Sequence, residues 1–165
     1  MDTIDSAFRG EKNAEIFNCL VNQRGKKELT MDKPKILLID DDPDIAELVG
    51  ITLEANGYQF YRASNGTEGL KMVKEIRPDL IILDVMMDTT TEGFQVSYHL
   101  RGKDPQSEYR EFSQIPIIMM TGISQKMHMT FSPEQDGDYL PVDDFLEKPV
   151  RVDSLLEKIK KALKR

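Results

Sequence analysis

The chain has 165 residues, and its 22 Lys and Arg against 29 Asp and Glu give a formal net charge of −7 at pH 7. So acidic a chain lacks the basic surface that sequence-independent nucleic-acid binding needs, and we expect no nucleic-acid partner. No stretch approaches the ~20 apolar residues of a membrane span, and no secretory pattern opens the sequence, so no membrane partner is expected. A single cysteine excludes an internal disulfide and fits a reducing compartment, which predicts a cytoplasmic protein.

Residues 1–33 differ in character from the rest of the chain. Apolar residues at helical spacing between Ile16 and Val21 make a short amphipathic helix over residues 12–23 plausible. The alternative, which we favour, is a loosely docked or disordered N-terminal extension. In either case we expect this segment to be dispensable for folding of a domain that comprises residues 34–165.

From Lys35 onward, strand-like and helix-like segments alternate. We expect strands at residues 35–39, 58–63, 79–83, 115–120 and 143–147, and helices at residues 43–55, 65–76, 94–101 and 152–163. Asp42 reads as the N-cap of the first of these helices, Asn56-Gly57 reads as its left-handed C-terminal cap, and Leu48 lies on its expected buried stripe. The strands are continuous apolar runs, typical of a parallel sheet that helices cover on both faces. The sequence therefore predicts an α/β fold with a doubly wound, five-stranded parallel sheet.

Polar residues gather where the predicted strands end. Asp40 and Asp41 follow the first strand, Asp84 ends the third, Thr121 ends the fourth, and Lys148 follows the fifth. In a doubly wound sheet, ligands bind outside the carboxyl ends of the strands, so these side chains are expected to converge. Clustered carboxylates need a neutralising cation, and Mg²⁺ suits a small, partly hydrated site with oxygen ligands. A hydroxyl and an ammonium beside them favour phosphoryl transfer with a carboxylate as the nucleophile.

Four segments, ILLIDDDPDI, PDLIILDVMM, IPIIMMTG and DFLEKPV, resemble the receiver domain of two-component response regulators, of the chemotaxis-regulator-like, flavodoxin-like type. The resemblance covers about residues 34–165. It implies that Asp84 is the phosphoacceptor, which takes its phosphoryl group from a histidine kinase or a histidine phosphotransfer protein. It also implies that Mg²⁺ binds to Asp40, Asp41, Asp84 and the backbone carbonyl of Met86.

The same resemblance assigns further roles around that site. Thr121 and Lys148 would bind the phosphoryl oxygens, with Thr121 as the switch hydroxyl, and Phe145 would be the aromatic residue whose rotamer follows it. Met86 and Ile123 occupy the two positions that tune how long the phosphoryl group lasts. Both are apolar, which predicts slow self-dephosphorylation.

Two segments depart from the family's pattern. The loop after Asp84 has Asp88 where the family usually has a proline, and it is about one residue longer. Between Thr121 and Lys148, Gly137 and Pro141 leave room for about one helical turn. We therefore expect the family's fourth helix to be short, displaced or replaced by a loop, and a standard receiver dimer cannot be assumed.

These features predict a single-domain response regulator that acts through contacts with an unknown downstream protein, because the sequence ends with the closing helix. It is expected to catalyse only its own phosphorylation and dephosphorylation, and so not to be an enzyme in the usual sense. Two alternatives stay open. A haloacid-dehalogenase-like phosphatase would use the Asp40-x-Asp42 pattern after the first strand, and a receiver-derived adaptor would bind its partners without phosphorylation.

Overall fold

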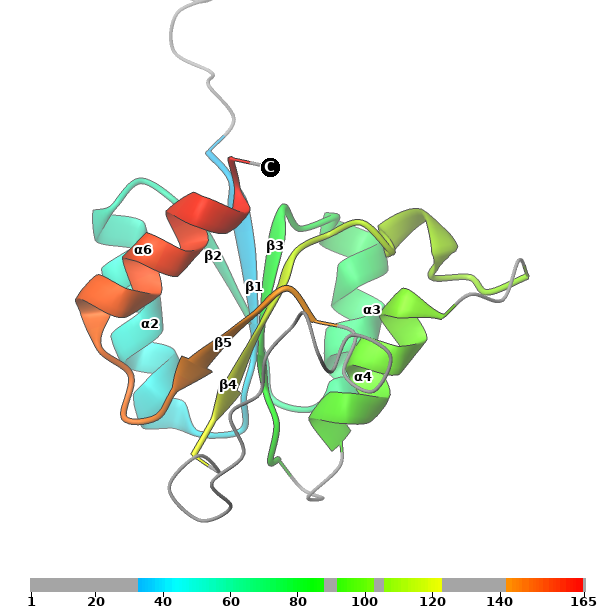
Figure 1. The fold of residues 1–165 in the computed structure, drawn as a ribbon, viewed down its shortest axis with the longest axis horizontal. Helices are drawn as coiled ribbons and strands as arrows, with labels where there is room; N and C mark the ends of the chain where they lie inside the picture. The colour runs from blue at the N-terminus through cyan, green and yellow to red at the C-terminus, as the bar shows by residue number, and fades with distance from the viewer. Residues whose placement is uncertain (1–32, 88–91, 103–105, 123–141, 165) are drawn as a thin grey trace, which may run out of the picture. The chain divides into compact units, whose positions relative to one another are not determined.

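The computed structural model describes residues 33–87, 92–102, 106–122 and 142–164, and from Pro34 onward these belong to one compact unit. The strands are β1 (Lys35–Ile39), β2 (Gln59–Ala63), β3 (Leu80–Asp84), β4 (Ile117–Thr121) and β5 (Asp144–Glu147) (Figure 1). The helices are α2 (Pro43–Ala55), α3 (Gly66–Ile76), α4 (Glu92–Arg101), α6 (Val152–Ala162) and a short 3-10 helix, η1 (Arg110–Phe112). None of the helices in these ranges is long and apolar enough to cross a membrane. The helix expected over residues 12–23 lies outside the described residues.

The five strands are all parallel and lie in the order β2-β1-β3-β4-β5. The chain passes from β1 outward to β2, then returns across β1 to β3 and continues to the other edge. This arrangement confirms the doubly wound, five-stranded parallel sheet that the sequence predicted. The direction of winding changes between β1 and β3, so the carboxyl ends of these two strands flank the point where ligands bind in such folds.

Side chains of each strand alternate between two hydrophobic clusters. In β1, Ile36 and Leu38 belong to one cluster, Leu37 and Ile39 belong to the other, and all four are fully buried. The first cluster includes residues of α2 and α6, and the second includes residues of α3 and α4. Figure 1 shows these two helix pairs on opposite faces of the sheet. Burial on both faces explains why the strands read as unbroken apolar runs.

Helix α2 has the predicted ends but turns a slightly different face to the sheet. Asp42 caps it, and Gly57 takes a left-handed φ of 84° just after it, both as expected. Leu48, expected on the buried stripe, is 41% exposed. A Cβ at Gly50 would lie 2.8 Å from the Phe60 ring, so the helix packs closely through this glycine. The close contact turns the buried face toward Gly50 and leaves Leu48 at its edge.

Helix α4 begins at Glu92, two residues before the predicted range of 94–101. The Glu92 Oε1 accepts a hydrogen bond from the Gly66 amide at 2.6 Å, which ties the first turns of α3 and α4 together. The sequence predicted that this helix starts at Phe94, so the structure adds Glu92 and Gly93 at its amino end. The expected change in the family's fourth helix falls within residues 123–141 and lies outside the described residues.

An arginine joins three segments near the amino ends of β4 and β5. Arg101, the last residue of α4, donates to the Ser113 carbonyl, to the Ile115 carbonyl at 2.8 Å and to the Asp143 carboxylate at 2.5 Å. The same carboxylate oxygen accepts from the Ile117 amide at 2.9 Å. The Arg101 and Asp143 side chains are only 17% and 26% exposed. This ion pair therefore holds the start of β5 against β4 and α4.

Candidate functional site

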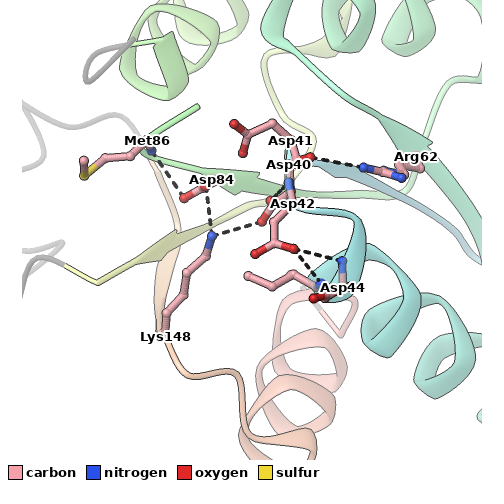
Figure 2. Close-up of polar contacts among 9 residues, drawn as sticks. Asp40, Asp41, Asp42, Asp44, Arg62, Asp84, Met86 and Lys148 are labelled. Carbon is pink, nitrogen blue, oxygen red and sulfur yellow. Dashed lines mark hydrogen bonds and ion pairs between the residues drawn. The ribbon is translucent and has the colours of Figure 1, made fainter. Parts of the chain in front are cut away.

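Hydrogen bonds fix the loop that follows β1. The Asp40 amide donates to the Ala63 carbonyl of β2 at 3.1 Å, and the Asp42 amide donates to Asp40 Oδ1 at 2.8 Å. Asp42 turns its own carboxylate to α2, where Oδ1 accepts from the amides of Asp44 at 2.8 Å and Ile45 at 3.3 Å. Asp42 therefore acts as the predicted helix cap, and Asp40 is left facing the sheet edge (Figure 2).

Lys148 bridges two buried carboxylates, one that follows β1 and one at the end of β3. Its Nζ lies 3.1 Å from Asp40 Oδ2 and 2.9 Å from Asp84 Oδ2. Asp40 is fully buried and Asp84 is 4% exposed. The second Asp84 oxygen, Oδ1, accepts from the Met86 amide at 3.3 Å. Figure 2 shows the lysine reaching up between the ends of β1 and β3, where the three charges meet.

Burial and charge pull the pKa values of this cluster in different directions. Burial raises the pKa of Asp40 above its ordinary value, although the Asp42 amide and the Lys148 ammonium favour its charged form. Burial alone would lower the pKa of Lys148, but hydrogen bonding and charge from Asp84 and Asp40 outweigh it and raise that pKa. These surroundings therefore favour the charged form of Lys148, whereas burial disfavours the charged form of Asp40.

Three of the acids are placed to bind one metal ion. Carboxylate oxygens of Asp40, Asp41 and Asp84 lie within 4.8 Å of one another, with Asp41 exposed and the other two buried. With Lys148 beside them, the three carboxylates leave a formal charge of −2, which a divalent cation neutralises. Oxygen ligands on an open edge, where water can complete the coordination, fit Mg²⁺.

The other residues singled out by the sequence are placed as follows. Thr121 is buried at the end of β4, and its carbonyl accepts from the Lys148 amide at 3.0 Å. Phe145 pairs with Met119 in the β4–β5 ladder and packs, partly buried, against the cluster on the α3 and α4 face. Met86 is 48% exposed beside Asp84. Ile123 lies outside the described residues. The structure thus brings Asp40, Asp41, Asp84 and Lys148 together, with Thr121 joined through its backbone.

Sequence reasoning missed two residues at this edge. A Cβ at Gly93 would lie 2.1 Å from the backbone oxygen of Asp84, so α4 packs directly on the end of β3. Arg62 donates from Nη2 to the Asp41 carbonyl at 3.3 Å. For Arg62 the sequence held a usable signal, namely an arginine near the end of a largely apolar strand. The glycine gave no comparable signal, because only its neighbour in space explains it.

Replacing Asp40 by Asn should stabilise the metal-free protein by about 1 kcal/mol near neutral pH, because it removes the excess buried carboxylate and leaves a one-to-one pair of Lys148 with Asp84. The folded-state pKa of Asp40 is raised, so its contribution to stability is fully present below the ordinary Asp range and lost as the pH rises through that raised pKa. The difference in unfolding free energy between Asp40→Asn and wild type should therefore grow as the pH rises. Urea unfolding in EDTA at several pH values measures it, and a variant less stable than wild type at pH 7 would contradict it.

Comparison with known proteins agrees with this geometry. A family model of the response regulator receiver domain matches residues 36–160. The DNA-binding dual master transcriptional regulator RpaA of Synechocystis sp. is 35% identical over 132 residues, which cover 80% of this chain and 50% of RpaA. The chain therefore belongs to the response regulator receiver domain family of two-component signalling systems. It spans about half the length of the curated relatives it matches.

Solved structures share the fold. The Vibrio cholerae chemotaxis protein CheY4 matches with a TM-score of 0.62 at 32% identity, over 79% of this chain and 98% of that chain. The receiver domain of the sensor histidine kinase PA1611 of Pseudomonas aeruginosa, solved with a magnesium ion coordinated in its active-site cleft, matches with a TM-score of 0.65 over 81% of this chain and 99% of that chain. Its identity is 18%, so this likeness concerns the fold alone.

Proposed function

We propose that the chain is a phosphorylatable receiver in which Asp84 accepts a phosphoryl group from a histidine kinase or a histidine phosphotransfer protein. The observation that carries the proposal is the cluster at the carboxyl ends of β1 and β3: three acids within reach of one metal ion, and a lysine that contacts two of them. Asp40, Asp41, Asp84 and the Met86 carbonyl would hold Mg²⁺, which neutralises charge on the phosphoryl oxygens. Output would pass through contacts with a downstream protein.

The proposed reaction transfers a phosphoryl group from the imidazole of a donor histidine to the carboxylate of Asp84. An Asp84 carboxylate oxygen forms a bond to phosphorus while the bond from phosphorus to the donor imidazole nitrogen breaks and its electron pair returns to the imidazole. Lys148, whose ammonium already lies 2.9 Å from Asp84 Oδ2, would then pair with a phosphoryl oxygen. The Thr121 hydroxyl would donate a hydrogen bond to another phosphoryl oxygen, and the Phe145 side chain would follow the movement of Thr121.

The direct test is phosphoryl transfer to the full chain from a small phosphodonor, acetyl phosphate, in Mg²⁺. We expect incorporation of one phosphoryl group per chain, stable in acid and released by base, because an acyl phosphate is hydrolysed by hydroxide. Excess EDTA should abolish incorporation. Full labelling in EDTA, or a base-stable product, would refute the proposal.

The phosphoryl group should be long-lived, because the two residues proposed to flank it, Met86 and Ile123, cannot orient an attacking water by hydrogen bonding. Replacing Met86 by Asn and Ile123 by Glu should speed hydrolysis about tenfold, equivalent to roughly 1.4 kcal/mol of activation free energy. Release of labelled phosphate after the donor is removed measures both rates. Decay of the wild type within seconds, or an unchanged rate in the double variant, would contradict this expectation.

The phosphatase alternative would use the Asp40-x-Asp42 pattern after the first strand, and so the side chain of Asp42. Both hydrogen bonds from the first turn of α2 end on one oxygen of its carboxylate, and the family match places the chain among receiver domains. Neither finding favours a phosphatase. The adaptor alternative differs from our proposal in one measurable respect, since partner binding by an adaptor would be the same with and without phosphorylation. The single-domain organisation and the cytoplasmic location stay predictions of the sequence.

A further inference from the structure

Arg62 lies at the carboxyl edge of the sheet beside the acidic loop, residues 40–42, which joins β1 to α2, as Figure 2 shows. It is the fourth residue of β2 and pairs with Leu38 in the β1–β2 ladder. Its Nη2 donates to the Asp41 carbonyl at 3.3 Å, and the carbonyl of the next residue, Ala63, accepts from the Asp40 amide at 3.1 Å. Two neighbouring residues of β2 therefore hold two neighbouring residues of the acidic loop.

Packing alone does not explain an arginine at this position. Its Nε is buried and, among the residues that the structure describes, finds no acceptor within hydrogen-bonding distance. A buried donor without a partner destabilises a fold, and a β-branched or aromatic residue would suit a half-buried strand position better. What the arginine adds is a donor long enough to reach the peptide group of Asp41 from the neighbouring strand.

We propose that Arg62 is a positioning residue for magnesium binding, in which its guanidinium holds the Asp41 peptide group so that the Asp41 carboxylate stays beside Asp40 and Asp84. The inference rests on the proposed function, because it takes Asp41 as a metal ligand. Groups that orient metal ligands without touching the metal commonly change metal affinity by about 10- to 100-fold when they are removed.

The direction of the effect distinguishes positioning from simple electrostatics. The guanidinium carries charge of the same sign as the metal ion, so a purely electrostatic role predicts that its removal strengthens Mg²⁺ binding. Positioning predicts the opposite, because a loop that has lost its anchor must be ordered again when the metal binds.

The test is calorimetric titration of the full chain with Mg²⁺ alone, at fixed ionic strength. Arg62→Met and Arg62→Gln each remove the charge and the contact with the Asp41 carbonyl. Arg77→Met is the matched control, because it removes the same charge from an arginine whose guanidinium bonds Glu111 instead. We expect both Arg62 variants to bind Mg²⁺ about tenfold more weakly than wild type. The control should stay within about twofold. Equal or tighter binding by either folded Arg62 variant overturns the inference.

Two further measurements test the positioning role of Arg62 and distinguish its failure from a failure of the proposed metal site. In EDTA, amide hydrogen exchange of Asp42 should be faster in Arg62→Met than in wild type, since the loop is then less restrained, and unchanged exchange counts against positioning. The variant Asp41→Asn tests the metal assignment itself. If Asp41→Asn also leaves Mg²⁺ binding unchanged, the proposed function fails at its metal site. If Asp41→Asn weakens binding and the Arg62 variants do not, only the role of Arg62 is wrong.

Discussion

Replacing Asp84 by Asn should lower phosphoryl incorporation from acetyl phosphate at least about 100-fold. An amide oxygen is a far weaker nucleophile than a carboxylate, and no acyl phosphate can form on it. Asn has nearly the same size as Asp, and its amide oxygen can still accept from Lys148, which now bonds Asp84 Oδ2 at 2.9 Å; only the longer bond of 3.3 Å from the Met86 amide to Oδ1 is lost. The fold should therefore survive, and quantitative mass spectrometry of the intact chain gives the result.

The chain offers a matched control at the other end of the same strand. Asp79 precedes β3, and its Oδ2 accepts from the Lys35 amide at 2.7 Å, at the opposite end of the strand from the acidic cluster of Asp40, Asp41 and Asp84. The substitution Asp79→Asn changes the same functional group and should leave incorporation within about twofold of wild type. If Asp84→Asn is labelled as fast as Asp79→Asn, then the phosphoacceptor is another residue.

Replacing Asp143 by Ala should lower the free energy of unfolding by about 3 kcal/mol, because it leaves the Arg101 guanidinium largely buried without its counter-charge. The Ile117 amide also loses its side-chain acceptor. A loss of this size lowers the melting temperature by on the order of 10 °C in a domain of this length. Urea denaturation followed by circular dichroism measures the free energy directly.

The control for charge is an exposed pair of the same kind. Arg77 and Glu111 form a bidentate ion pair, but their side chains are 64% and 54% exposed. Removing it with Glu111→Ala should cost less than about 1 kcal/mol, since water screens exposed pairs. The double variant Arg101→Met, Asp143→Leu should recover part of the loss, because it leaves no unpaired buried charge. A change below about 1 kcal/mol in Asp143→Ala would show that the pair does not anchor β5.

The parts of the fold that the sequence predicted are those set by local pattern. Unbroken apolar runs identified the strands, and Asp42 with Gly57 marked both ends of α2. The convergence of Asp40 and Asp84 followed from the topology alone, since parallel strands bring their carboxyl ends to one edge of the sheet. Their contact through Lys148 could thus be anticipated without any knowledge of distances.

What the sequence did not predict depends on pairs of residues far apart in the chain. The rotation of α2 that exposes Leu48 comes from the contact of Gly50 with Phe60. The pairing of Arg101 with Asp143 spans 42 positions, and each residue alone reads as an ordinary surface charge. Hydrophobic periodicity describes one segment at a time and carries no information about such partners.

The bare α-carbon of Gly93 has a consequence for how freely this chain can vary. A methyl group there would collide at 2.1 Å with the main chain of Asp84, and no side-chain rearrangement can relieve a clash with backbone. Glycine within a helix costs about 1 kcal/mol relative to alanine. At another helical position, replacing glycine by alanine would therefore be an easy route to greater thermostability. In a library of random variants, position 93 should thus be as intolerant as the acidic residues, although it carries no reactive group. Mutational intolerance in this protein would therefore identify both the residues that do the chemistry and the empty space that lets α4 approach them.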